Sequence, residues 1–313
     1  MGAPSKPTSE QGGKDRAVDK AADKGRGAGK GKRIALVLGS GGARGLAHIG
    51  IIQYLESLGH KIVYISGCSM GALVGGIYAA GQLEPYAEWA RKLEKRDMFS
   101  LLDLAFGWTG LFKGDRLMGV LKELVGDHVI EELPIGFTAV ATDLTEQREI
   151  WLNKGPLFDA IRASIAIPTV FTPHVYLGRV LVDGGLLNPI PIAPALNQDA
   201  DLIVAVNLNA HSGRSRRRAS QLARVEGRDL EGEEATQGEG EDPKVPGLVD
   251  VITASLDLMQ NSIARMKLAS YTPDVVIDVP RDACLFYEFY RAEELIALGR
   301  DCAERALTRS APA

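Results

Sequence analysis

Near its start, the chain contains the same pattern twice: a short aliphatic run, a glycine-rich turn and a helical run. The residues "RIALVL" (33–38) lead into "GSGGARG" (39–45), and apolar residues at helical spacing follow until Gly59. The residues "KIVYIS" (61–66) then lead through "GCSMG" (67–71) into a helix of small residues that ends at Gly81. Strands that alternate with helices in this way predict a parallel sheet covered by helices, which is the α/β class.

The alternation continues along the chain, less regularly in the middle. Further strands are predicted at 135–144, 148–152, 179–185, 202–208 and 274–279, and further helices at 156–167, 248–270 and 291–308. Two segments lack large apolar side chains and are predicted to be disordered: a basic tail at 1–32 and an insertion at 212–247. We therefore predict one domain, residues 33–309.

Composition excludes several classes of function. A net charge of −4 gives no indication of a nucleic-acid partner. No apolar run approaches the roughly 20 residues that a membrane-spanning helix needs. The three cysteines, Cys68, Cys284 and Cys302, show no C-x-x-C spacing and cannot build a disulfide framework. Their pattern favours a reducing, cytoplasmic location.

The turn at 67–71 has the form Gly-x-Ser-x-Gly, with Ser69 in the centre. In a nucleophile elbow, the serine lies on a tight turn between a strand and a helix, and the flanking glycines avoid collisions with neighbouring backbone. Gly67 and Gly71 fit this role. The alternative is a serine that only caps the following helix. Because a strand and a helix flank the turn, we favour the nucleophile.

The glycine loop at 39–45 matches neither common phosphate-binding motif. A dinucleotide fingerprint needs glycine where Arg44 stands, and a P-loop needs a following Gly-Lys-Ser/Thr. The loop still presents backbone amides at a helix start, where they could stabilise the oxyanion of an acyl-transfer reaction. Gly41 and Gly42 are the best candidates. Arg44 could hold the loop or meet a phosphate, and the whole loop could instead be only a tight turn.

The base that would activate Ser69 is less obvious. Of the five histidines, His48 lies beside the glycine loop, and His211 lies next to the insertion, where a base is poorly positioned. A partly desolvated aspartate can also accept a serine proton. Asp183 in "DGG" follows an apolar run and is one candidate. Asp143 is the other, although an Asx turn is the simpler interpretation of it.

Together, "GSGGARGLAHIG", "GCSMGALVGGIYAAG" and "VDGGLLNPIPI" resemble the patatin-like phospholipase family, with support from "ATDL" and "IRASIAIP". The chain is similar to small bacterial members of the RssA type and to the catalytic domain of neuropathy target esterase. The resemblance implies a three-layer α/β/α sandwich around a mainly parallel sheet. It also implies a Ser–Asp dyad of Ser69 and Asp183, in which Gly184 and Gly185 complete the Asp-Gly-Gly motif, and an oxyanion hole at Gly41, Gly42, Ala43 and Arg44.

The implied activity is hydrolysis of fatty-acyl esters of phospholipids or lysophospholipids through an acyl-serine intermediate, with no metal or other cofactor. The alternatives are a transacylase and a non-catalytic binding protein of the same fold. Ser40 departs from the family's usual first glycine, which could alter turnover. The apolar segment 98–112 could hold the acyl chain or contact a membrane, although ordinary core is the simpler interpretation. We expect a cytoplasmic protein, which could also bind peripherally to the inner membrane.

Overall fold

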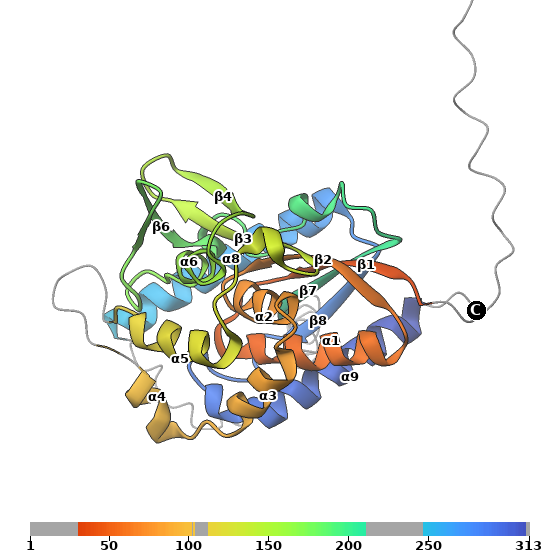
Figure 1. Ribbon diagram of the computed structural model, residues 1–313, viewed down its shortest axis with the longest axis horizontal. Helices are drawn as coiled ribbons and strands as arrows, with labels where there is room; N and C mark the ends of the chain where they lie inside the picture. The colour runs from red at the N-terminus through yellow and green to blue at the C-terminus, as the bar shows by residue number, and fades with distance from the viewer. Residues whose placement is uncertain (1–30, 102, 104–111, 211–246, 311–313) are drawn as a thin grey trace, which may run out of the picture. The chain divides into compact units, whose positions relative to one another are not determined.

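The computed structural model describes residues 31–101, 103, 112–210 and 247–310 (Figure 1). The basic tail up to residue 30 and residues 211–246 of the predicted insertion lie outside the described residues. So does most of the apolar segment, namely residues 102 and 104–111. Lys32, which we assigned to the tail, is already attached to the sheet, because its amide donates to His60 Nδ1 and its carbonyl accepts from the Lys61 amide.

A parallel sheet forms the centre of the fold. Its strands run in the order β3-β2-β1-β7-β8. Their bounds are β1 Arg33–Leu38, β2 Lys61–Cys68, β3 Gly136–Asp143, β7 Leu202–Ala210 and β8 Val275–Pro280. β1 lies in the middle, and all but its first residue are buried, as expected for an aliphatic strand covered on both faces.

Three further strands extend the sheet beyond β3 with antiparallel pairing. They are β4 Arg148–Leu152, β5 His174–Tyr176 and β6 Arg179–Asp183. Both β4 and β6 pair with β3, and β5 pairs with β6 at the edge. The register sets Asp183 opposite Ala141 of β3, while Cys68 of β2 lies opposite Val140. The ends of β2 and β6 therefore meet across one strand.

Helices cover both faces of the sheet. Along β1, Ile34, Leu36 and Leu38 belong to the larger core on one face, and Ala35 and Val37 to the smaller core on the other. This alternation follows from the two-residue period of a strand. The larger core is covered by α1 Ala47–Ser57, α2 Met70–Ala79, α3 Leu83–Arg91, α5 Asp115–Val125, α6 Leu157–Ser164 and α9 Ala292–Ser310. The smaller core is covered by α8 Leu248–Tyr271 and by the short turn Ala193–Ala195.

The three-layer α/β/α arrangement predicted from the sequence is confirmed. Each strand and helix predicted above has a counterpart in the structure, and β2 extends to Cys68, two residues further than expected. Four elements of the structure were not predicted: α3, α5, the short edge strand β5 and α4 Lys95–Leu101. None of the helices among the described residues has both the length and the apolar character required to cross a bilayer.

Two glycines allow α1 and α9 to touch through their backbones. A Cβ atom added at Gly50 of α1 would collide with the Ile296 carbonyl of α9, and one added at Gly299 of α9 would collide with the Ala47 carbonyl of α1. No flexible side chain lies between the helices at these points, so the contact cannot relax by changing a rotamer. The close approach depends on the absence of side chains at both positions.

We expect Gly50→Ala to destabilise the fold by more than about 1 kcal/mol, because the helices must separate to admit one methyl group. Gly119→Ala is the matched control. Gly119 lies on the exposed side of α5, and nothing lies within 4 Å of its added Cβ. This second change should stabilise the fold by about 0.5–1 kcal/mol through helix propensity. Urea unfolding of both variants measures the change in the free energy of unfolding. If the two changes had the same sign, the close contact between α1 and α9 would not be the cause.

Candidate active site

Ser69 lies on a strained turn between β2 and α2. Its backbone has φ 55° and ψ −124°, a conformation that non-glycine residues adopt rarely, and its side chain is almost fully buried. Backbone segments approach closely on both sides. A Cβ at Gly67 would collide with the Gly71 carbonyl and would lie 2.6 Å from Ala72 Cα, and one at Gly71 would collide with the Leu38 carbonyl. The glycines of the Gly-x-Ser-x-Gly motif are therefore required by packing.

Ser164, at the end of α6, braces this turn. The Ser69 amide donates to Ser164 Oγ at 3.0 Å, and Ser164 Oγ donates to the Val140 carbonyl at 2.6 Å. Ser164 is fully buried. Ser164 lies within the segment "IRASIAIP", which supports the family resemblance, but no pattern in the sequence predicts this role for the serine. The bridge links the turn to the neighbouring strand β3.

Asp183 reaches the same place from the end of β6. Its Oδ1 accepts hydrogen bonds from the Gly185 amide at 2.7 Å and from the Cys68 thiol at 3.8 Å. The other oxygen, Oδ2, is buried and has no partner at ordinary hydrogen-bond geometry among the described residues. Burial raises the pKa of Asp183 to about 6, although hydrogen bonding from Ser69, Gly185 and Cys68 opposes the shift. The structure thus brings Ser69 and Asp183 together, and Oδ2 of Asp183 makes no hydrogen bond of ordinary geometry to a described residue.

The glycine loop lies beside the Ser69 turn. A Cβ at Gly45 would collide with Met70 Cβ, so the two segments are in contact. Within the loop, the Ala43 amide donates to the Phe286 carbonyl at 2.9 Å. The Gly41 and Gly42 amides have no acceptor among the described residues. Of the residues predicted for the oxyanion hole, these two therefore retain free backbone donors, and Ala43 does not.

Arg44 is buried and holds the loop in shape. Its Nε donates to the Gly41 carbonyl at 3.0 Å, and its Nη1 donates to the Arg281 carbonyl at 2.8 Å. Burial lowers the pKa of Arg44, and the Asp257 charge opposes that shift. Of the two roles left open by the sequence, these contacts support the structural one.

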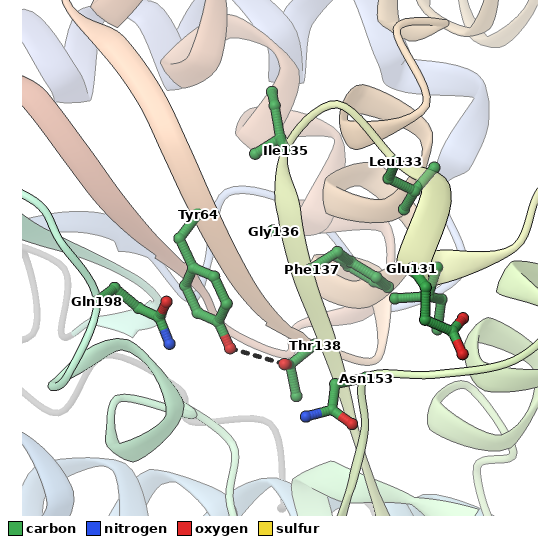
Figure 2. A pocket seen from close by; sticks show the side chains of 10 residues that line it. Tyr64, Glu131, Leu133, Ile135, Gly136, Phe137, Thr138, Asn153 and Gln198 are labelled. Atoms are coloured by element: carbon green, nitrogen blue, oxygen red, sulfur yellow. Dashed lines mark hydrogen bonds between the residues drawn. The ribbon is translucent and has the colours of Figure 1, made fainter.

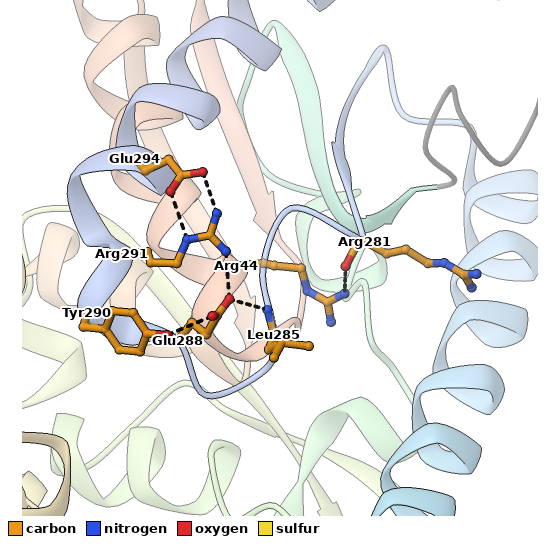
Figure 3. A network of polar contacts seen from close by, with 7 residues as sticks. All are labelled: Arg44, Arg281, Leu285, Glu288, Tyr290, Arg291 and Glu294. Carbon is orange, nitrogen blue, oxygen red and sulfur yellow. Dashed lines mark hydrogen bonds and ion pairs between the residues drawn. The ribbon is translucent and has the colours of Figure 1, made fainter. Parts of the chain in front are cut away.

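The segment that follows β8 contacts the loop, and Figure 3 shows Arg44 of the loop bonded to Arg281 at the start of this segment. Phe286 packs directly against Gly42, where a Cβ would collide with its ring and where φ is +56°. The segment is fixed by Glu288, which accepts from the Leu285 amide at 2.9 Å, Tyr290 Oη at 2.8 Å and Arg291 Nη1 at 2.7 Å. The Leu285 amide, with Arg291 and Tyr290, lowers the pKa of Glu288 to about 2. The sequence contains no signal for this contact.

The other candidate groups have different partners. His48 is fully buried, its Nε2 lies 2.9 Å from the Gly39 carbonyl, and burial lowers its pKa to about 4. It supports the start of the glycine loop as a neutral ring. Asp143 forms the predicted Asx turn, since Oδ1 accepts from the amides of Thr145 and Glu146, and it also pairs with Arg179 at 2.6 Å. His211 lies outside the described residues.

A cavity of about 270 Å³ lies elsewhere, around the start of β3 (Figure 2). Its lining includes Tyr64 and Thr138, whose hydroxyl groups are 2.6 Å apart, as well as Gln198 and Asn153. Ser69 follows the C-terminal end of β2, whereas this cavity opens near Gly136, the first residue of β3. The cavity therefore does not belong to the site of Ser69 and Asp183.

Comparison with known proteins identifies the family. Residues 36–196 match the model of the patatin-like phospholipase family. An uncharacterized NTE family protein of Mycobacterium tuberculosis strain H37Rv is 40% identical, over 88% of this chain and 91% of its own length. The chain belongs to the patatin-like phospholipase family, as the sequence motifs predicted. Membership in this family implies a lipid hydrolase.

More distant relatives are much longer proteins. Lysophospholipase NTE1 of Yarrowia lipolytica is 29% identical over 89% of this chain, which corresponds to 20% of that protein. Patatin-like phospholipase domain-containing protein 6 of Mus musculus is 32% identical over 58% of this chain and 14% of its own length. In both cases the similarity covers only a small part of the larger protein.

The raised pKa of Asp183 makes a stability prediction that does not depend on function. Between about pH 4 and pH 6 the folded state binds more protons than the unfolded chain, so ionised Asp183 destabilises the fold above this window. Asp183→Asn removes the charge and should stabilise the fold by about 3 kcal/mol at pH 8, and by little at pH 4.

Urea unfolding at both pH values measures this difference. Asp127→Asn is the control, because Asp127 is an exposed partner of Lys122 and its removal should have a small effect at either pH. An Asp183→Asn variant that is less stable than wild type at pH 8 would show that burial does not dominate the electrostatics of this carboxylate.

Proposed function

We propose that the protein is a serine acyl hydrolase in which Ser69 is the nucleophile and Asp183 the general base. The observation that carries this proposal is the meeting of the two side chains in a buried site, with Ser69 on a strained turn and an Asp183 oxygen without another partner. Neither feature is required for a serine that merely caps a helix. Strain and desolvation at one point are typical of catalytic sites.

In the first half of the reaction, ionised Asp183 accepts the hydroxyl proton of Ser69 as Oγ attacks the acyl carbonyl. A pKa of about 6 leaves the carboxylate mostly ionised at neutral pH, yet more basic than an exposed aspartate. The carbonyl π bond opens to an oxyanion and then re-forms as the ester C–O bond breaks. Asp183 returns its proton to the leaving alcohol, and the acyl group remains on Ser69.

In the second half, Asp183 accepts a proton from water while the water oxygen attacks the acyl carbon. The bond to Ser69 Oγ breaks, the proton passes to Ser69, and a free fatty acid leaves. Both tetrahedral intermediates carry an oxyanion. The free amides of Gly41 and Gly42, beside the Ser69 turn, are the donors that we assign to it. One such donor is typically worth about 3 kcal/mol in the transition state.

We further propose a phospholipid or lysophospholipid as the acyl ester. The name of the Yarrowia relative, a lysophospholipase, supports this choice. A transacylase would form the same acyl-Ser69 and pass it to an alcohol instead of water, so the products distinguish the two reactions. The three cysteines are unpaired thiols, which supports our expectation that the protein acts in a reducing compartment such as the cytoplasm.

The central prediction is that a fluorophosphonate probe labels Ser69 alone. Ser69→Ala should remove the label and reduce ester hydrolysis by at least about a thousandfold, because the nucleophile is lost. Mass spectrometry locates the adduct. Ser164→Ala is a useful comparison, since it loses the brace of the turn but retains Ser69, and should label more slowly. Absence of labelling in a folded wild-type protein would favour the binding-protein alternative.

We also propose that α8 docks the enzyme on the surface of a phospholipid bilayer, where its substrate resides. Four large apolar side chains, spaced for one helical face, are exposed on α8: Val251, Leu258, Met259 and Met266. The other exposed side chains described on α8 are small or polar, with Arg265 as the only charge. Among these described exposed side chains there is no carboxylate and one cation, a composition that suits an anionic lipid surface.

Replacing Leu258 and Met266 together by serine should weaken binding to vesicles of phosphatidylcholine and phosphatidylglycerol by at least about tenfold, since two apolar side chains no longer enter the lipid. Vesicle co-sedimentation measures it. Leu58→Ser with Leu196→Ser is the control, because both leucines are exposed outside α8. Hydrolysis of a soluble short-chain ester should be unchanged in both variants. Equal binding of the two variants would exclude α8 as the docking face.

A further inference from the structure

Ser40, the residue that replaces the usual glycine, is buried, and its polar groups have three separate partners. Its amide donates to the Pro189 carbonyl at 2.9 Å, and its carbonyl accepts from Asn209 Nδ2 at 3.4 Å. Its hydroxyl donates to Gln260 Oε1 of α8 at 3.1 Å. Ser40 directly precedes Gly41 and Gly42. The Gln260 hydrogen bond therefore links the loop that carries the two free amides to α8, the helix that covers the smaller core.

Gln260 and Ser40 also meet beside the candidate dyad. A Cβ atom added at Gly185 would lie 2.9 Å from Asp183 Oδ1, 3.0 Å from Gln260 Nε2 and 3.1 Å from Ser40 Oγ. Three polar atoms from β6, α8 and the glycine loop thus surround one point next to Gly185. Oε1 of Gln260 accepts from the Ser40 hydroxyl, and Nε2 is the Gln260 atom nearest this point, at 3.0 Å.

We propose that Ser40 and Gln260 form a positioning pair that fixes the glycine loop relative to Asp183 during acyl transfer. The pair acts through the Gly41 and Gly42 amides and through the Asp183 carboxylate, and neither member is a catalytic residue. The inference rests on the proposed function of Ser69 and Asp183. It assigns a use to Ser40, which in the sequence is only a departure from the family pattern.

The physical basis is the geometry that an oxyanion requires. Donors stabilise the transition state only when they lie within hydrogen-bond distance of the developing oxyanion, and small displacements reduce the rate strongly. The loop is fixed from the other side by the Ala43–Phe286 and Arg44–Arg281 hydrogen bonds. The Ser40–Gln260 bond supplies the constraint on the side of Asp183. Loss of this constraint should affect kcat more than KM, because ground-state binding does not need the same alignment.

The first test compares Ser40→Ala, Gln260→Leu and the double variant with a soluble short-chain ester. Each single variant should reduce kcat about tenfold and leave KM within about twofold. The double variant should be no slower than the slower single variant, because both remove the same bond. Gln198→Leu is the matched control, since Gln198 donates to the Pro194 carbonyl away from the site. Its kcat should equal that of wild type.

The second test uses Gln260→Glu and the pH profile of kcat/KM. This change retains an acceptor for Ser40 but places a second carboxylate beside Asp183. Among the described residues, the titratable side chain that contacts Asp183 is the Cys68 thiol on β2. Glu149 of β4 acts on Cys68 and pairs with Lys267 of α8 at 3.6 Å. On α8, Asp257 lies three residues before Gln260 and interacts with Arg44 and Arg281. None of them changes. The maximal kcat/KM of Gln260→Glu should be higher than that of Gln260→Leu, because the bond to Ser40 is retained. The acid limb, near pH 6 in wild type, should move to higher pH by at least about half a unit, because the second carboxylate raises the pKa of Asp183.

If Gln260 had only a structural role, the rate of each variant would fall in proportion to its loss of stability. The acid limb of the pH profile would then remain near pH 6. That result, or rates of Gln260→Leu and Ser40→Ala equal to wild type, would overturn the pair. Probe labelling separates this failure from failure of the proposed function. If wild-type Ser69 is labelled and all variants are labelled at its rate, only the positioning pair is wrong. If wild-type Ser69 is not labelled, both proposals are wrong.

Discussion

The close contact of backbone with backbone around Ser69 is the constraint from which the rest of the site follows. With no side chain at Gly67 or Gly71, the start of α2 lies directly against the ends of β1 and β2. The chain can then reverse within one residue, and Ser69 takes up its strained conformation. Such a conformation persists only when the surroundings hold it, and here Ser164 and the packed sheet do so.

Electrostatics at the site follow from the same packing. The tight contacts exclude water from the end of β6, so Asp183 is desolvated and its pKa rises. No described cation pairs with Asp183, and the buried Arg44 guanidinium bonds instead to the carbonyls of Gly41 and Arg281. A carboxylate beside a guanidinium would be a weak base. The positive charge of Arg44 is thus held in the glycine loop, and the pKa of the Asp183 carboxylate remains raised.

Local patterns in the sequence explain why so much of the fold could be predicted. β1 and α1 differ clearly in hydrophobic period, and the glycines at 67 and 71 act within one turn of chain. The unpredicted contacts are long-range. Ser40 and Gln260 are 220 residues apart, and Phe286 lies still further along the chain from Gly42. No local period signals such pairs. Similarly, α5 is amphipathic but lies far along the chain from the motifs that indicate the family.

The contact of Phe286 with the glycine loop has a consequence for biosynthesis. The Ser69 turn, the loop and Asp183 all leave the ribosome well before residue 286 does, yet the loop is held in place by the Phe286 carbonyl and by Arg281. Until residue 286 is synthesised, the nascent chain lacks the acceptor of the Ala43 amide, so the glycine loop lacks one of the hydrogen bonds that hold it. The loop beside Ser69 therefore acquires its full set of hydrogen bonds only after β8, the last strand of the sheet, has been synthesised.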